Sequence, residues 1–128
     1  MTRGELTEYI EQSYHVRPEN PFPKDFESAV FRHKDNQKWF ALIMRIGRDK
    51  LGIRQEGQVD ILDVKAEPQM ISAIVGSSGI YPAYHMNKTH WVTVLLDGSA
   101  ADDVVKSLVD ISFTLTESRK KRKHSIQQ

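Results

Sequence analysis

Two histidines in the second half of the chain, His85 and His90, are the first residues whose chemistry suggests a site. They flank Asn87-Lys88 within a run rich in β-forming residues. This pattern predicts a β-hairpin with a two-residue turn, because Asn tolerates left-handed backbone. In that register His85 faces His90, and directly opposed side chains lie about 4.5–5.5 Å apart at Cβ. Two facing imidazoles can share a metal ion, or hold a phosphate when protonated.

The same hairpin offers too few ligands for a tight metal site. No Asp or Glu stands in either predicted strand to complete the pair, so a hydrogen-bonded or exposed histidine pair is the alternative. The register also sets Tyr84 opposite Trp91, which predicts an aromatic packing pair. We therefore expect no bound metal here, and we expect the polar tip of the hairpin to meet any partner.

The rest of the chain shows no catalytic apparatus. It contains no cysteine, which excludes disulfides, thiolate catalysis and cysteine metal sites. The Gly76–Gly79 segment lacks the Lys-Ser/Thr of a phosphate loop and follows a predicted helix, where a P-loop follows a strand. Asp60 and Asp63 fall on opposite faces of one predicted strand, so they form no acid/base pair. The sequence predicts a protein that is not an enzyme and needs no cofactor.

Basic residues gather at two other places. Arg32, His33, Lys34 and Lys38 surround a predicted turn at Lys34–Gln37, and this turn is either a cationic wing or an ordinary solvated turn. The polar loop from Gly47 to Gln58 is rich in basic residues, and it is either a surface that faces an anion or, as we expect, an ordinary exposed connection.

Composition and charge favour one soluble domain. The chain has 128 residues, 39% of them hydrophobic, which suits one core. Five of the 18 basic residues and none of the 17 acidic residues lie in 118–128, so the body holds 13 basic and 17 acidic residues. We expect one domain over 1–117 and a basic, disordered tail over 118–128. With neither a signal peptide nor an apolar span, we expect a cytoplasmic protein.

Periodicity predicts the order of elements. Helices are expected at about 3–14, from Pro68, and at about 100–116, with capping boxes at Thr2/Glu5 and Ser99/Asp102. Strands are expected at 26–33, 38–46 and 59–65, followed by the hairpin pair. Trp39–Met44 is apolar on both faces, which predicts a covered central strand. The expected fold is a two-layer α+β domain, an antiparallel sheet with helices packed on one face.

Two runs of residues resemble a known family. They are Lys38-Trp39-Phe40-Ala41-Leu42 and Pro82-Ala83-Tyr84-His85-Met86-Asn87-Lys88-Thr89-His90-Trp91. The chain is similar in these runs to the MmcQ/YjbR family, over about residues 3–117. The resemblance implies an α-β(3)-α-β(2)-α fold, an architecture compared with frataxin-like proteins and with type III secretion chaperones.

The family is described as a DNA-binding domain of "double wing" type. Carried over by position, the wings would be the Lys34–Lys38 turn and the Met86–Thr89 turn. The implied DNA contacts are Arg32, His33, Lys34, Lys38, His85, Asn87, Lys88 and His90.

Three functions remain open at this stage. The first is a DNA-binding module whose basic tail adds non-specific, salt-dependent affinity. The second is a protein-interaction or chaperone-like module. The third is a metal- or small-ligand-binding domain using His85 and His90, or the row of Glu5, Glu8 and Glu11 on the predicted first helix. The expected partners are DNA, a protein partner or a second copy of the chain, and no membrane.

Overall fold

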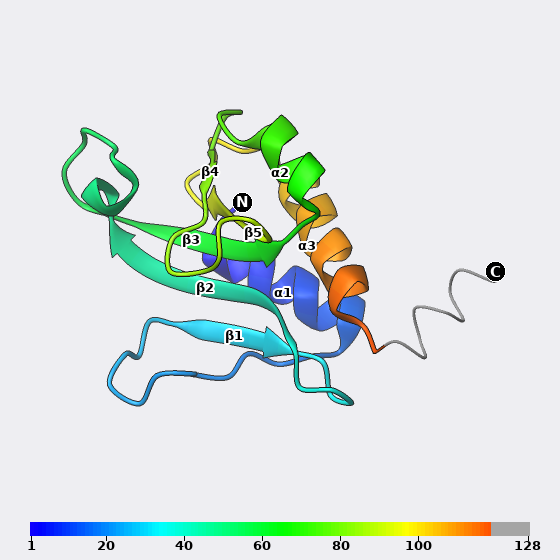
Figure 1. The fold of residues 1–128 in the computed structure, drawn as a ribbon. Helices are drawn as coiled ribbons and strands as arrows, with labels where there is room; N and C mark the ends of the chain where they lie inside the picture. The colour runs from blue at the N-terminus through cyan, green and yellow to red at the C-terminus, as the bar shows by residue number, and fades with distance from the viewer. Residues whose placement is uncertain (119–128) are drawn as a thin grey trace.

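Five runs rich in Val, Ile and Phe form one antiparallel sheet in the computed structural model, which describes residues 1–118 (Figure 1). The spatial order of the strands is β1-β2-β3-β5-β4. Their bounds are β1 Ala29–Arg32, β2 Trp39–Gly47, β3 Gln58–Lys65, β4 Ile80–Pro82 and β5 Trp91–Leu95. The neighbouring strands β2 and β3 are the longest, and β2 contains the uninterrupted apolar run Trp39–Met44.

Apolar side chains are buried on both faces of this sheet. The helix-covered face carries the main core, to which the strands contribute Phe31, Phe40, Ala41, Ile43, Leu62, Val64, Val92 and Val94. On the opposite face Ile46, Val59, Ile61 and Leu95 pack against Met44, Leu51, Ile53, Tyr81 and Tyr84. The prediction that Trp39–Met44 is covered on both sides is therefore confirmed, and the second cover is made of loops.

The first helix, α1 (Arg3–Tyr14), begins with the predicted capping box. The Glu5 amide donates to Thr2 Oγ1 at 3.2 Å, and the Thr2 amide donates to Glu5 Oε1 at 2.8 Å. These bonds satisfy amide groups that a helix N-terminus otherwise leaves unpaired. Leu6 and Ile10 lie one turn apart and are buried in the main core, which fixes the face that α1 presents to the sheet.

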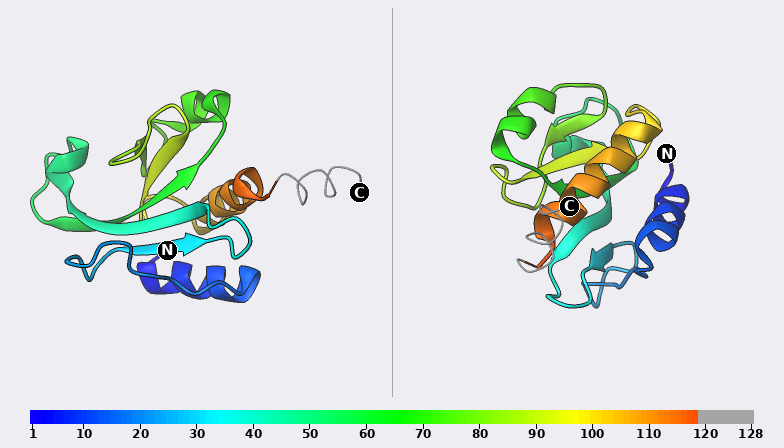
Figure 2. Two further views of the ribbon diagram at one scale, coloured as in Figure 1. Left: turned by 60° about the horizontal axis from the view of Figure 1, so that its bottom comes forward. Right: turned by 90° about the vertical axis from the view of Figure 1, so that its right-hand side faces the viewer.

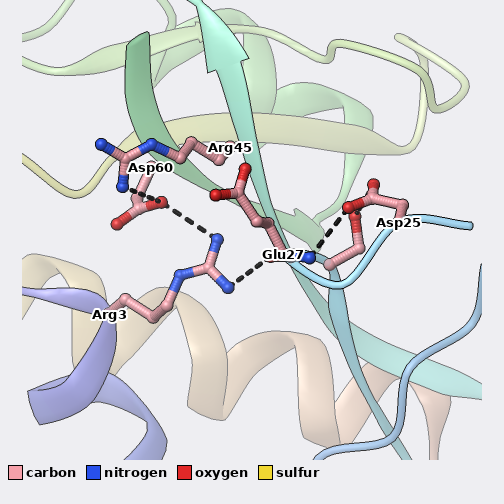
Figure 3. Close-up of polar contacts among 6 residues, drawn as sticks. Arg3, Asp25, Glu27, Arg45 and Asp60 are labelled. Carbon is pink, nitrogen blue, oxygen red and sulfur yellow. Dashed lines mark hydrogen bonds and ion pairs between the residues drawn. The ribbon is translucent and has the colours of Figure 1, made fainter.

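Arg3 ties the start of α1 to two strands (Figure 3). Its guanidinium donates to the carbonyl of Glu27, just before β1, and its Nη2 lies 3.0 Å from Asp60 Oδ1 on β3. Arg45 Nη1, on β2, lies 3.9 Å from the same Asp60 oxygen. One carboxylate thus meets two cations, so Arg3 and Arg45 are both partly neutralised.

The other helices are α2 (Pro68–Ile74) and α3 (Asp102–Thr116), with Pro68 at the first turn of α2 as expected. The predicted Ser99/Asp102 capping box is wrong. Ser99 instead bonds Asp97 Oδ1, through its amide at 3.0 Å and its hydroxyl at 2.5 Å. The α3 N-cap is Ala101, which makes no side-chain cap. Because the Ser99 hydroxyl bonds Asp97 within this turn, it does not cap α3.

Ser112 of α3 lies where two central strands separate. Pairing between β2 and β3 ends at Leu42 and Asp63, and beyond that point the buried Ser112 hydroxyl bridges the strands. It accepts from the Lys65 amide at 2.9 Å and donates to the Phe40 carbonyl at 2.6 Å. This hydroxyl replaces a lost ladder contact, because buried backbone groups need partners.

The observed fold is the expected α-β(3)-α-β(2)-α arrangement. Side chains of all three helices enter the main core, and Figure 2 shows the three helices and the sheet in two further views. No helix within residues 1–118 has both the length and the apolar character to cross a membrane.

Candidate functional site

The second predicted wing is an eight-residue loop, not a two-residue turn. Pairing of β4 with β5 runs from Ile80 with Val94 to Pro82 with Val92 and stops there. Residues 83–90 then form what we call the 83–90 loop. Proline has no N–H to extend a ladder, and two residues later the Tyr84 amide donates to a side chain, Thr93 Oγ1, at 2.8 Å.

Asn87 shapes the tip of this loop with local bonds. Its side-chain oxygen accepts from the Thr89 amide at 2.7 Å, and its carbonyl accepts from the Trp91 amide at 2.9 Å. Such Asx turns compete with strand pairing. The side-chain oxygen of Asn87 is thus used within the loop, and a contact with a phosphate would fall to its Nδ2 donors.

The predicted pairing of His85 with His90, and of Tyr84 with Trp91, does not form. His85 has left-handed backbone (φ 71). Its ring lies edge-on to Phe22 at 6.2 Å and stacks on Tyr84 at 5.9 Å between centroids. Within residues 1–118 no three metal-ligating side chains come together. The facing imidazoles on which a metal site depended are absent from this part of the chain.

Beneath the loop lies a buried carboxyl group that sequence reasoning did not single out. Asp63 is fully buried on β3, on the face opposite the helices, and accepts a hydrogen bond from Thr93 Oγ1 on β5. Its Oδ2 has no hydrogen-bond partner among the described residues. Burial raises the pKa of Asp63 to about 7, while the Thr93 hydroxyl and the charge of Lys88 oppose this rise.

Lys88 links the 83–90 loop to this centre. Its Nζ donates to the carbonyl of Ala83 at 2.8 Å, closing the loop on itself, and its charge acts on Asp63. Bonds therefore run from the loop through Thr93 to Asp63.

The first predicted wing, residues 33–38, contains one clear correction. His33 is only 4% exposed, and its Nε2 lies 2.8 Å from Thr116 Oγ1 and 3.1 Å from the Phe113 carbonyl on α3. It also packs against the rings of Phe40 and Phe113. His33 is a core residue and cannot meet DNA. A histidine can lie on the surface or, when hydrogen-bonded, in the core. The sequence alone does not tell which, because the partners of His33 come from a distant helix.

The other residues of this wing differ in availability. Arg32 forms a two-pronged ion pair with Glu19, with Nε at 2.9 Å and Nη2 at 2.5 Å from the two carboxylate oxygens. Lys34 and Lys38 are exposed. Asn36 Nδ2 donates to the Thr116 carbonyl at 2.9 Å, which holds the turn against the end of α3.

Strand register places both wings at the same end of the sheet. Leu42 pairs with Asp63, and Lys65 pairs with Trp91, so the start of β2, the end of β3 and the start of β5 lie together. The 33–38 turn and the 83–90 loop both join the sheet there. The basic loop over 48–57 joins β2 at its other end, about 27 Å away for a strand of nine residues.

Comparison with known proteins identifies the family. The YjbR family profile matches residues 13–115. The chain belongs to the YjbR family. Its relatives include the uncharacterized Bacillus subtilis protein YyaQ, 32% identical over 117 residues, which cover 91% of this chain and 99% of YyaQ. Escherichia coli YjbR, also uncharacterized, is 38% identical over 53 residues, which cover 41% of this chain and 45% of that protein.

Two similar proteins of known structure have the same fold. A Pseudomonas syringae protein of known crystal structure is 44% identical, with a TM-score of 0.89, and the match covers 91% of this chain and 100% of that one. A Deinococcus radiodurans protein is 27% identical, with a TM-score of 0.70, over 96% of this chain and 86% of that one.

Proposed function

We propose that this YjbR family member is a non-enzymatic module that binds DNA through its phosphate backbone. The proposed surface lies at the end of the sheet where the 33–38 turn and the 83–90 loop join their strands. Its exposed cationic side chains are Lys34 and Lys38 of the turn. Arg32 and His33 are left out, because an ion pair occupies the first and burial removes the second.

One observation carries this proposal. The bonds from Asn36 and His33 to Thr116 hold the end of α3 against the first wing. Ser118, the last described residue, follows Thr116 by two positions, so the chain leaves α3 near the 33–38 turn. In sequence the next five residues are all basic.

The local charge at this end thus differs from that of the body. Asp35 and Glu117 are the acids nearest in sequence, and they are outnumbered by the cations of the turn and of the following residues. Clustered cations bind phosphates with little regard to base sequence. The residues after Ser118 lie outside the described part of the chain, and their predicted disorder remains a prediction.

Fluorescence anisotropy with labelled duplex DNA at two salt concentrations tests the proposal on the full chain. The double variant Lys34→Gln/Lys38→Gln should bind more weakly at low salt. The slope of log affinity against log salt should become shallower by about 2, one for each lost phosphate contact.

A matched double variant serves as the control. Lys24→Gln/Arg54→Gln removes two exposed cations from the opposite end of the sheet and should leave that slope in place. Equal losses in both double variants, or no binding by the unmodified chain at low salt, would contradict the proposal.

The alternative, a protein-interaction or chaperone-like module without nucleic-acid binding, has one observation in its favour. A hollow of about 290 Å³ between α2 and α3 is lined mainly by apolar side chains, among them Met70, Ile74 and Leu108. Val104 in the same lining is 41% exposed. Light scattering across a concentration series tests the simplest case, a second copy of the chain. A monomer at every concentration, unchanged by Val104→Lys, would count against it.

A further inference from the structure

A cationic hollow lies between two loops that are far apart in sequence. It has a volume of about 160 Å³, with Lys50 of the 48–57 loop and Lys88 of the 83–90 loop in its lining. Tyr81 and Tyr84 line it as well, and no carboxylate is found among the described residues around it. Two lysines beside aromatic side chains make a suitable place for a phosphate attached to a flat ring.

A larger hollow adjoins it along the edge strand β4. This second space, of about 460 Å³, shares Tyr81 and Pro82 with the first and also takes in Arg48, Ser77 and Asp97. Its volume is within the range of small-molecule sites, about 300–1,000 Å³. The two hollows adjoin at Tyr81 and Pro82 and are called here the β4 groove; the smaller holds Lys50 and Lys88, and the larger holds Arg48 with hydroxyl and carboxylate groups.

The two lysines are available for an anion. Neither Lys50 nor Lys88 forms an ion pair with any residue from 1 to 118, and both are exposed. Lys88 Nζ donates one of its three hydrogens to the Ala83 carbonyl, which leaves two for a ligand. The carboxyl group whose charge acts on Lys88 is Asp63, which is buried and whose pKa is raised to about 7. Near neutral pH that carboxyl group therefore cancels only part of the lysine charge.

We propose that the β4 groove binds a nucleoside phosphate, with the phosphate between Lys50 and Lys88. Tyr81 and Tyr84 would pack against the base or sugar. Ser77 and Asp97, in the larger hollow, would receive hydroxyl groups of the ligand. Asp97 Oδ1 accepts bonds from the Ser99 amide and hydroxyl, and Arg48 stands in the same lining.

This inference goes beyond the proposed DNA contact and does not depend on it. The β4 groove lies on the loop-covered face beside β4, and Lys34 and Lys38 are not part of its lining. A nucleoside phosphate can come from a free nucleotide or from a single strand of nucleic acid. The shared chemistry is the phosphate with its neighbouring ring, and the two sources are separated by experiment.

Titration of the full chain, followed by ¹H–¹⁵N NMR, tests the proposal with four probes. These are adenosine monophosphate, adenosine, inorganic phosphate and a short single-stranded oligodeoxynucleotide. Adenosine monophosphate should shift amides of the 48–51 and 83–90 segments and bind better than adenosine or phosphate alone. Lys50→Gln should weaken it about tenfold, the loss typical of one charge-assisted hydrogen bond.

Two further variants keep the test decisive. Lys88→Gln should also weaken adenosine monophosphate, while Lys34→Gln, far from the β4 groove, should not. Tighter binding of the oligonucleotide with the same dependence on Lys50 assigns the site to single strands, and equal or weaker binding assigns it to free nucleotides. The proposal is overturned if no nucleotide probe saturates below about 10 mM. It is also overturned if Lys50→Gln changes nothing, or if phosphate binds as well as adenosine monophosphate.

Discussion

Replacing the buried carboxyl group of Asp63 by an amide should make the stability of the protein less dependent on pH. Asp63→Asn keeps the shape of the side chain and an oxygen that can accept from Thr93. It removes a group whose pKa, raised by burial, lies at about 7 instead of its ordinary 3.8. The amide nitrogen would take the place of Oδ2, which has no partner among the described residues.

The direction in which stability changes with pH follows from the direction of the pKa shift. The folded state holds the Asp63 proton more tightly than the unfolded state, so the contribution of Asp63 to stability is full below pH 3.8. It is lost as the pH rises to about 7, and it changes little above that. The pKa values differ by about three pH units at about 1.4 kcal/mol each. The loss is therefore about 4 kcal/mol, as an order of magnitude.

Urea denaturation at several pH values between 4 and 8 measures this effect. The free energy of unfolding of Asp63→Asn minus that of the unmodified protein should rise by about 4 kcal/mol across the range. At pH 8 the variant should be the more stable of the two, since an unpaired amide costs only about 1–3 kcal/mol. Asp49→Asn, at an exposed carboxylate, controls for the loss of one negative charge.

The reasoning would be refuted by a difference that stays constant with pH to within about 0.5 kcal/mol. An NMR titration of the Asp63 side-chain carboxyl carbon gives an independent check. Its midpoint should lie near 7, and a midpoint close to 3.8 would show that water reaches the group in the folded state.

Three further substitutions test the packing that supports the site, all measured by chemical denaturation. Thr2→Ala should cost about 1 kcal/mol, because it removes the N-cap of α1, and a cost near zero would mean that the helix end frays. Ser112→Ala should cost about 2–4 kcal/mol, because two strand backbone groups lose their partner; Ser107→Ala, exposed on the same helix, should cost almost nothing. Gly79→Ala should be more damaging than Gly76→Ala. Both have positive φ, but a Cβ at Gly79 would lie 2.9 Å from a backbone nitrogen, whereas nothing lies within 4 Å at Gly76. Equal costs at the two glycines would contradict the close approach.

Local patterns were enough to predict the elements of this fold. The capping box at Thr2, the proline that opens α2 and the apolar run from Trp39 to Met44 each rest on interactions within a few residues. Such interactions are readable from sequence because their partners are neighbours in the chain. Element order then left few arrangements other than an antiparallel sheet with helices on one face.

The candidate site was less predictable because its contacts join distant residues. The turn of the β4–β5 connection was misplaced because Asn87 also suits a local Asx turn, which the longer loop uses. Ser99 was read as a helix cap, yet Asp97, two residues earlier, provides its partner. His33 was read as a surface cation, yet α3, about 80 residues later, buries it.

The sequence by itself determined the family, the elements and the cationic character of the two wings. Only the tertiary structure placed the wings at one end of the sheet and folded the 83–90 loop over Asp63. The physical reason is that charge and periodicity are properties of single residues and their neighbours. Burial is a property of the assembled chain, and here it makes one aspartate a core group with a raised pKa. Folding also brings Lys50 and Lys88, which belong to loops at opposite ends of the strands, into the lining of one hollow.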